Sequence, residues 1–398
     1  MKKDWEIKKL GEVTQICLGL THTPKYQETG IPFISVKDIS SGNLSFDNTK
    51  RIAKEEYDSM PWGAKPKKGD VLFCRVGTIG IPQIVKTDVE FGIFVSVGFF
   101  RTYKILFNEY LKYWLYSDNF FYQVEKNVVG STIKNLNTGW LKNFTLPLPP
   151  LEEQKRIVKI LDEKFAQLET IKTNAQTNLQ NAKDLFRSQL AKVFSNTTWK
   201  KKRLGDSSEL ITKGSSPKWQ GINYVTDDGI LFVTSENVRE NYIDLEKSKY
   251  LEKKFNDKQK RSILKKNDVL VNIVGASIGR AAIFDFDIVD ANINQAVALI
   301  RSKNEIDVHF LSYFLNSDNA MNQYNNAKKD TARANLSLED INNLRIPLPP
   351  LPEQKRIVKE LDTLSEKVRQ LQEVYTKQIA NCDELKQAYL QKAFEGEL

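Results

Sequence analysis

The 398-residue sequence predicts an α+β fold in which one architectural unit, a globular domain followed by a long helix, occurs twice. Three observations predict it. Residues 147–159 recur as residues 347–359, and the two copies differ only where Glu152 is replaced by Pro352. Before each copy, short β-branched and aromatic runs are broken by Gly and Pro, which is typical of strands. After each copy, apolar residues return every three or four positions, which is typical of helices.

Weaker similarity extends the repeat on both sides of these motifs. Residues 31–39 resemble 230–238, and residues 110–119 resemble 310–319. The chain therefore reads as globule, helix, globule, helix. The predicted boundaries are a first globular domain at 1–150, a first long helix at 151–197, a second globular domain at 198–350 and a second long helix at 351–398.

Within the globular domains the sequence predicts mostly strands and a few helices. Val71–Phe73, Phe94–Val97 and Val269–Val271 are strand-like runs. A helix is expected around 111–115, with a copy in the second domain, and the aromatic residues around it are expected to lie in the core.

The two long helices carry apolar residues at coiled-coil spacing. Each covers about 40 residues, or roughly 60 Å at 1.5 Å per residue. Helices this long need a long apolar partner, and the other copy is the obvious one. Antiparallel pairing of the two would give a dumbbell with approximate two-fold symmetry; the alternative is that each helix packs on its own globule. The residues expected between the helices are Ile157, Leu161, Leu168, Ile171, Leu185, Ile357, Leu361, Leu364, Val368, Leu371 and Leu385.

Composition narrows the function. The formal charge of +9 and the pI near 9.1 favour a polyanionic partner, although this signal alone is weak. Cys17, Cys74 and Cys382 lie far apart and form no C-x-x-C pair, so we expect free thiols in a reducing cytoplasm, with neither a disulfide nor a zinc site. No stretch approaches about 18 consecutive apolar residues, so a membrane span is not expected.

The repeated motif resembles one family in particular. Residues 147–158 and 347–358, each opening a long helix, and the ending at 390–398 are similar to the specificity subunits of type I restriction–modification systems, over essentially the full length. The resemblance implies a non-catalytic DNA-binding subunit with two target-recognition domains, which together recognise a bipartite, asymmetric double-stranded DNA target. It implies that the helices fix the gap between the half-sites. The implied partners are two methyltransferase subunits and, in the restricting complex, motor–nuclease subunits, which would bind the S-adenosylmethionine, ATP and magnesium.

Three loop regions, present in both domains, are the candidates for DNA contact. They combine small residues, hydroxyls, amides and basic side chains, which can approach phosphates or read base edges. The simpler interpretation, that such stretches are only turns, remains open for each of them. The candidates are Thr21, Thr23, Lys25, Arg75, Thr78, Ser131, Thr132, Lys134 and Asn135 in the first domain, and Lys213, Ser215, Ser216, Lys218, Asn272, Ser277, Arg280, Thr331, Arg333 and Asn335 in the second.

The sequence argues against two other classes of function. An enzyme acting on DNA would carry a recognisable motif, but 147–150 lacks the acid or amide and the aromatic of an adenine methyltransferase, and no nucleotide-binding P-loop is present. Glu153-Gln154-Lys155 could suggest a nuclease, yet it sits at the start of a helix without an evident partner Asp. No nucleophile constellation is recognisable, and no metal site is expected. A pure coiled-coil adaptor would need only the helices, not two large diverged globules.

Overall fold

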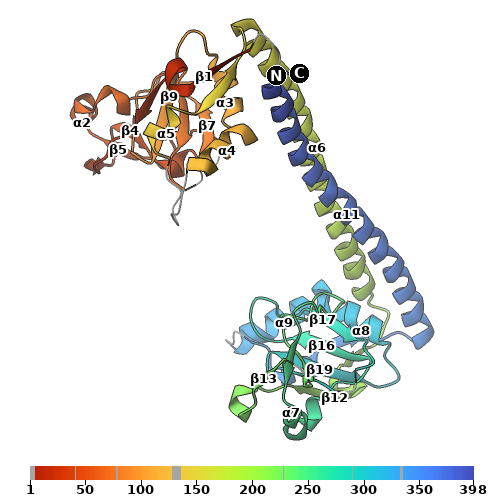
Figure 1. Cartoon of the computed structure of the whole chain (residues 1–398). Helices are drawn as coiled ribbons and strands as arrows, with labels where there is room; N and C mark the ends of the chain where they lie inside the picture. Colours follow the sequence, from red (N-terminus) through yellow and green to blue (C-terminus); the bar gives the residue numbers. More distant parts are fainter. Residues whose placement is uncertain are drawn as a thin grey trace. The chain divides into compact units, whose positions relative to one another are not determined.

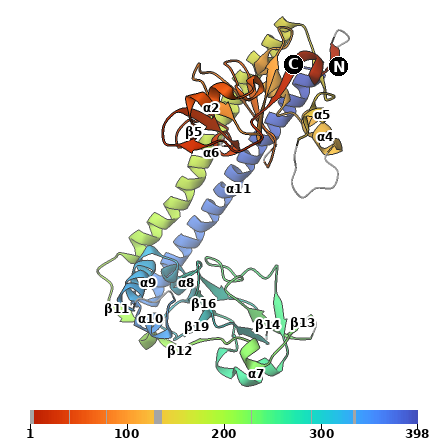
Figure 2. The same ribbon diagram turned by 90° about the vertical axis from the view of Figure 1, so that its left-hand side faces the viewer.

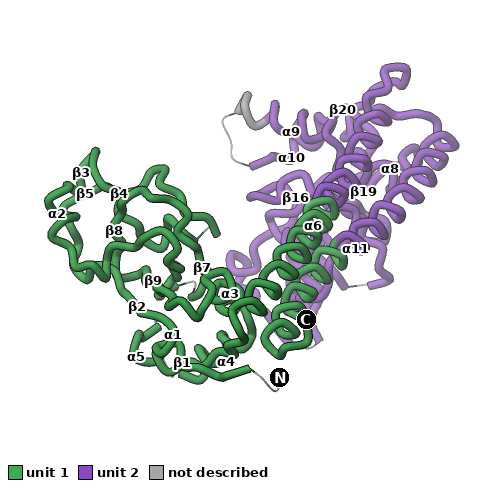
Figure 3. The backbone as a smooth tube through the Cα atoms, turned by 90° about the horizontal axis from the view of Figure 1, so that it is seen from above, with its two compact units in different colours: residues 1–176, 376–398 green, residues 177–375 purple. Residues whose placement is uncertain are grey.

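The computed structural model describes residues 5–40, 42–77, 79–127, 136–226, 228–288, 290–331 and 335–398 (Figure 1). The chain forms two compact units, one of residues 1–176 with 376–398 and the other of residues 177–375 (Figure 3). Each unit holds one globular domain and a part of each long helix, α6 (Leu151–Phe194) and α11 (Leu351–Glu395). The predicted α+β repeat is confirmed.

The first globular domain contains two four-stranded sheets. One is antiparallel in the order β2-β9-β6-β7, and the other has the order β3-β5-β4-β8, in which β4 and β8 are parallel. A separate antiparallel pair, β1 and β10, joins the start of the domain to its end. The strands are β1 (Glu6–Lys9), β2 (Thr14–Leu18), β3 (Tyr26–Gln27), β4 (Ile31–Ile34), β5 (Lys50–Ile52), β6 (Val71–Cys74), β7 (Gly80–Ile84), β8 (Gly92–Ile93), β9 (Val97–Thr102) and β10 (Thr145–Leu148).

The second globular domain repeats this topology strand for strand. Its sheets have the orders β12-β19-β16-β17 and β13-β15-β14-β18, with β14 and β18 parallel, and β11 pairs with β20. The strands are β11 (Lys201–Arg203), β12 (Ser208–Lys213), β13 (Tyr224–Val225), β14 (Ile230–Val233), β15 (Lys249–Leu251), β16 (Asp268–Asn272), β17 (Ala281–Phe284), β18 (Ala291–Ile293), β19 (Val297–Ser302) and β20 (Arg345–Pro347).

Short helices complete each domain. The helix expected around 111–115 is α3, and its copy is α8, which packs on the sheet that contains β16 and β17 (Figures 1 and 2). The helices are α1 (Leu10–Val13), α2 (Lys54–Ser59), α3 (Asn108–Trp114), α4 (Asp118–Asn127) and α5 (Thr138–Leu141) in the first domain, and α7 (Lys254–Lys258), α8 (Val308–Leu315), α9 (Asp318–Thr331) and α10 (Leu338–Asn343) in the second. The aromatic residues of α3, Tyr110, Tyr113 and Trp114, are buried in the core as expected.

One predicted strand is wrong. Phe94–Val97 was expected to be extended, but only Val97 belongs to a strand, the first residue of β9. The N–H of Val97 donates to the carbonyl of Phe94 at 2.8 Å, which closes a tight turn between β8 and β9. Apolar side chains alone do not distinguish a buried turn from a strand.

The glutamine of the repeated motif anchors each globular domain to its helix. Gln154 is fully buried; its amide donates to the carbonyls of Ile105 and Pro149, and its oxygen accepts from the N–H of Phe107. Gln354 makes the same three hydrogen bonds in the second domain. Because each bond satisfies a backbone group, the motif serves structure in both copies.

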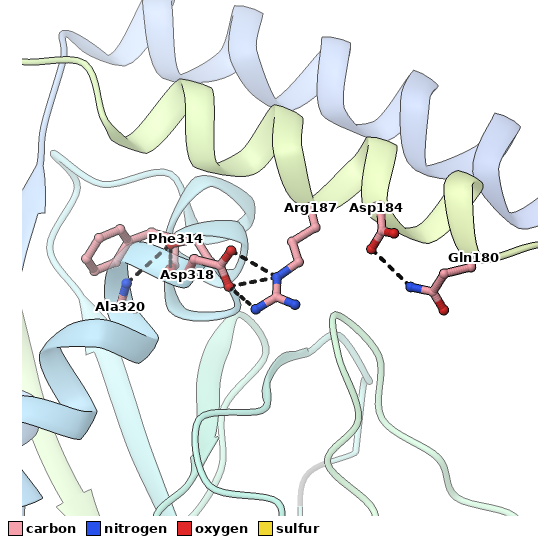
Figure 4. A network of polar contacts seen from close by, with 7 residues as sticks. Gln180, Asp184, Arg187, Phe314, Asp318 and Ala320 are labelled. Atoms are coloured by element: carbon pink, nitrogen blue, oxygen red, sulfur yellow. Dashed lines mark hydrogen bonds and ion pairs between the residues drawn. The ribbon is translucent and has the colours of Figure 1, made fainter. Parts of the chain in front are cut away.

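A second set of contacts joins the domains to the helices. Tyr113 donates a hydrogen bond to Asp162 in the first unit, and Tyr313 donates to Asp362 at 2.7 Å in the second. In the second unit, the guanidinium of Arg187 on α6 also donates to the carboxylate of Asp318, the first residue of α9, at 2.6–2.9 Å (Figure 4). That carboxylate lies at the positive end of α9, where the helix dipole favours it.

Within each unit α6 and α11 run antiparallel. In the first unit Ile157 and Leu161 share a core with Leu390 and Phe394, and in the second Leu190 shares one with Leu361 and Ile357. The expected coiled-coil pairing is therefore found. From 161 to 186, the buried and half-buried positions of α6 other than Lys164 step by four and three residues: 161, 165, 168, 172, 175, 179, 182 and 186.

Four of the residues expected between the helices lie outside this interface. The others are buried or, for Leu364, half-buried. The strict four–three step falls on the residue that follows each of these four. Lys172 and Lys386, which follow Ile171 and Leu385, therefore take interface positions. Their aliphatic stems pack there while their ammonium groups pair with Asp383 and Glu169. The four exposed residues, with side chains 39–54% exposed, are Ile171, Leu185, Leu371 and Leu385.

Candidate nucleic-acid interface

In the first domain, three segments that are distant in sequence meet at one end of the antiparallel sheet. Backbone hydrogen bonds join Leu20 to Ile93 at 2.8 Å, Val95 to Leu20 at 2.9 Å, and Arg75 to Ser96 at 2.9 Å, the first residue donating in each case. Two of the three candidate loops are thus brought together by the turn before β9. We call this the first loop cluster; it comprises residues 19–25, 75–77 and 94–96.

The second domain repeats part of this arrangement. Gly214 donates to the carbonyl of Val297 at 3.4 Å, and Ile273 donates to the carbonyl of Ala296 at 2.9 Å, as Arg75 does to Ser96. We call this the second loop cluster; it comprises residues 213–219, 273–280 and 294–296.

A glycine allows the close approach in each cluster. A β-carbon at Gly19 would lie 2.3 Å from the carbonyl oxygen of Phe94, and one at Gly214 would lie 1.8 Å from that of Ile293. No other residue fits at these contacts without moving backbone, so packing between loops explains the glycine of the first candidate loop in each domain.

The candidates on the first loop of each domain are accessible. Thr21, Thr23 and Lys25 are exposed, and in the second cluster Lys213 and Lys218 are exposed while Ser215 and Ser216 are half-buried. Exposed hydroxyls and ammonium groups beside a closely approaching backbone are the groups that contact phosphates.

Arg75 has a structural role in the first cluster. Its guanidinium donates from Nε to the carbonyl of Leu136 at 2.7 Å and from Nη1 to that of Val95 at 3.3 Å. It thereby ties the chain at Leu136 to the turn before β9. In the second domain Ile273 stands at this position, so the same backbone is held without the arginine.

The side chain of Asn272 stabilises the second cluster from within the core. The side chain is fully buried and donates to the carbonyls of Ser235 and Val238 and to the hydroxyl of Ser277. An amide held in this way is not available to DNA, which corrects the expectation for this residue. Ser277 is engaged by the same bond, while Arg280 is half-buried.

The third candidate loop lies largely outside the described residues. Asn335 is described and exposed, and Thr331 ends α9, but its side chain is outside the described part of the chain. The other candidates that lie outside the described residues are Thr78, Ser131, Thr132, Lys134, Asn135 and Arg333. Their DNA contacts stay predictions.

Sequence reasoning placed Trp219 in the first candidate loop but missed Tyr224, Glu236, Lys249 and Gln295, which lie in or beside the second cluster. Trp219 is 81% exposed and Tyr224 is 58% exposed, an unusual exposure for aromatic side chains. Lys249 pairs with Glu236 at 2.8 Å, and this hydrogen bond holds the pKa of the Glu236 carboxyl below its ordinary value. Gln295 is exposed on the turn before β19. Aligning the two repeats residue by residue, rather than loop by loop, would have pointed to this turn.

The described residues contain no cluster of potential metal ligands, and burial keeps two of the cysteine thiols unreactive. Within the described ranges, no group of three or more His, Cys, Asp or Glu side chains could hold a metal ion. Burial raises the pKa of the Cys17 and Cys74 thiols to about 11, so both stay protonated near neutral pH. In the same part of the chain no helix is long and apolar enough to cross a membrane.

Comparison with known proteins gives a uniform result. The family model for the type I restriction modification DNA specificity domain matches residues 2–179 and again 196–379. The specificity subunit of the type I restriction enzyme EcoBI from Escherichia coli is 27% identical, over 94% of this chain and 81% of its own length. That of EcoKI from Escherichia coli strain K12 is 23% identical, over 100% of this chain and 90% of its own length.

Solved structures share the fold. A chain from a structure describing complex assembly and conformational transition of the type I R-M system aligns with a TM-score of 0.79 at 21% identity, covering 100% of this chain and 99% of that one. The HsdS subunit from Thermoanaerobacter tengcongensis aligns with a TM-score of 0.62 at 22% identity, over 100% and 98%. With the family model matching both repeats, the chain belongs to the type I restriction–modification specificity subunits, which recognise DNA sequence and carry no catalytic activity of their own.

Proposed function

We propose that this chain recognises a bipartite, asymmetric DNA target, one half-site with each loop cluster, and directs methyltransferase and restriction subunits to it. The observation that carries the proposal is the duplication of one loop scaffold with different side chains. The backbone bonds made by Gly19, Arg75 and Phe94 recur at Gly214, Ile273 and Asn294, yet the side chains at the second and third of these positions differ. Two surfaces with the same geometry and different chemistry suit two different half-sites.

The long helices suit a spacing role. A reader of two half-sites needs its recognition surfaces at a defined separation, which other proteins obtain by dimerisation. Here both surfaces belong to one chain, and α6 and α11 connect them. We propose that these helices set the gap between the half-sites, so that inserting residues in both would change the gap and leave the half-site sequences unchanged.

The relatives support a proposal about the partners. The relatives named above are specificity subunits of type I restriction enzymes. We propose that this chain likewise assembles with two methyltransferase subunits and with motor–nuclease subunits in the restricting complex. S-adenosylmethionine, ATP and magnesium would then be bound by those partners.

Co-expression with a type I methyltransferase subunit in a methylation-free host tests the proposal. We expect single-molecule mapping of N6-methyladenine to show a split motif with a fixed gap and different halves, methylated once on each strand. The purified complex should bind DNA carrying this motif. The affinity should fall as salt rises, because phosphate contacts release counterions from the DNA and that release is less favourable at high salt.

Two results would contradict the proposal. A stable complex that produces no methylation motif would favour an adaptor role for the helices. A palindromic or continuous motif would show that the two clusters do not read different half-sites. A complex carrying Arg75→Ala gives a second test. Loss of the two bonds that Arg75 makes to backbone carbonyls should weaken recognition of only the half-site read by the first domain.

A further inference from the structure

The second loop cluster borders a pocket of about 360 Å³. This is at the small end of ligand pockets, which span roughly 300–1,000 Å³, so the pocket suits one small planar group. Phe232 and Tyr224 line it, in an edge-to-face pair with ring centroids 6.2 Å apart. Phe232 is almost fully buried, whereas Tyr224 is mostly exposed, so the pocket has an aromatic lining that opens to solvent.

The first domain fills the corresponding place with a side chain of its own. Phe94 and Asn294 are equivalent, because their N–H groups donate to the carbonyls of Ile34 and Val233 respectively, and each closes the same turn. The Phe94 ring packs edge-to-face on Phe33 at 6.3 Å. Asn294 is too short to do this, and its side-chain oxygen instead accepts from the N–H of Ala296. The pocket in the second domain is therefore the space that phenylalanine occupies in the first.

Polar groups surround the aromatic lining. Glu236 and Lys249 both border the pocket, and their ion pair at 2.8 Å leaves the rim without net charge there. Lys218 and Gln295 are exposed on the two loops that flank it. Carboxylates and amides can accept from the exocyclic amino groups of bases, and an amide can also donate to ring nitrogens and carbonyl oxygens.

We propose that this pocket receives one base of the second half-site, turned out of the helical stack. The proposal rests on the proposed DNA-reading function and adds to it a way of reading for the second half-site. The extruded base stacks on the ring of Tyr224, and Gln295 and Glu236 hydrogen-bond its edge. Lys218 neutralises a phosphate of the displaced nucleotide. Stacking on aromatic rings and edge contacts are how proteins hold unpaired bases, and they offset the cost of unstacking.

Mismatches and a fluorescent base test the proposal on the complex with its methyltransferase, once the motif is mapped. Each base of the second half-site except the methylated adenine is replaced in turn by 2-aminopurine, and separately each is placed opposite a mismatched base. At one position we expect 2-aminopurine fluorescence to rise on binding. At the same position a mismatch should tighten binding, because the unpairing cost is already met.

Asn294→Phe supplies the decisive variant. The same backbone accepts phenylalanine in the first domain, so the variant should fold with an unchanged melting temperature while its ring fills the pocket. The fluorescence rise should disappear and discrimination at that base pair should be lost. Tyr224→Ala is the second variant, expected to weaken binding of the half-site roughly 5- to 150-fold through lost stacking. Tyr103→Ala, an exposed tyrosine outside both loop clusters, is its control.

The outcomes separate the two proposals. If the complex binds and methylates a split motif, but no position shows fluorescence or mismatch tightening and Asn294→Phe reads the motif normally, the pocket holds no base and the DNA-reading function stands. If the complex shows no sequence preference at all, the proposed function itself fails, and the base pocket with it.

Discussion

Replacing Gly214 by alanine should weaken recognition of the second half-site without removing any group that touches DNA. The added β-carbon would lie 1.8 Å from the carbonyl oxygen of Ile293. Ordinary contacts between non-bonded heavy atoms need roughly 3.5 Å, so the two backbones must separate by about 1.5 Å or more. Overpacking of this kind costs roughly 1–3 kcal/mol, and we expect the upper part of that range because neither partner is a flexible side chain.

The effect on DNA follows from the displacement. The moved loop carries Ser216 and Lys218, so contacts equivalent to one base pair should be lost, which is worth roughly 1–3 kcal/mol, or about 5- to 150-fold in affinity. Titration of the methyltransferase complex with labelled DNA measures this loss. Gly63→Ala is the matched control, since its β-carbon meets no atom within 4 Å. Unchanged affinity and an unchanged motif in a folded Gly214→Ala complex would refute the assigned role of this contact.

Three further predictions concern stability. Gln354→Ala should lower the unfolding free energy by roughly 3–5 kcal/mol, because it leaves one buried and two half-buried backbone groups unpaired. Denaturant titration measures the loss, and a change under about 1 kcal/mol would argue against the anchor. Leu168→Ala should lower the unfolding free energy by roughly 2–5 kcal/mol, whereas Leu185→Ala should change it by no more than about 0.5 kcal/mol because Leu185 is 54% exposed. Equal losses of stability would contradict the four–three interface. Raising the pH from about 9 to about 11 should destabilise the fold, because the folded state keeps the Cys17 and Cys74 thiols protonated while the unfolded thiols ionise from about pH 9. A variant with alanine at both positions should lack that part of the loss of stability.

The sequence predicted the architecture well because the repeated motif is structural in both copies. The buried Gln154 and Gln354 satisfy equivalent backbone groups in the two domains, so the same sequence motif marks the same structural junction twice. The coiled coil was predicted from apolar spacing, but its exact face was not. Lys172 and Lys386 occupy interface positions that a search for apolar residues passes over, and the neighbouring Ile171 and Leu385 were chosen instead.

The candidate site was harder to predict because small polar residues serve two purposes. Gly19 and Gly214 fit a phosphate-binding loop equally well, yet the structure uses them to let two backbones touch. Asn272 has a side chain that could read a base, but it is buried and its hydrogen bonds hold the loop cluster together. Burial and hydrogen-bond partners decide between such roles, and neither can be read from residue type. The pocket beside Asn294 depends on the absence of a ring, which becomes visible only when the two domains are compared in space.

An exchange of one globular domain tests the central claim most directly. Residues 198–350 would be replaced by the corresponding segment of another specificity subunit with a known motif, and methylation would be mapped with the same methyltransferase. We expect one half of the motif to change to that of the donor, while the other half and the gap stay as they were. A motif that changes in both halves, or in neither, would contradict the assignment of one half-site to each domain.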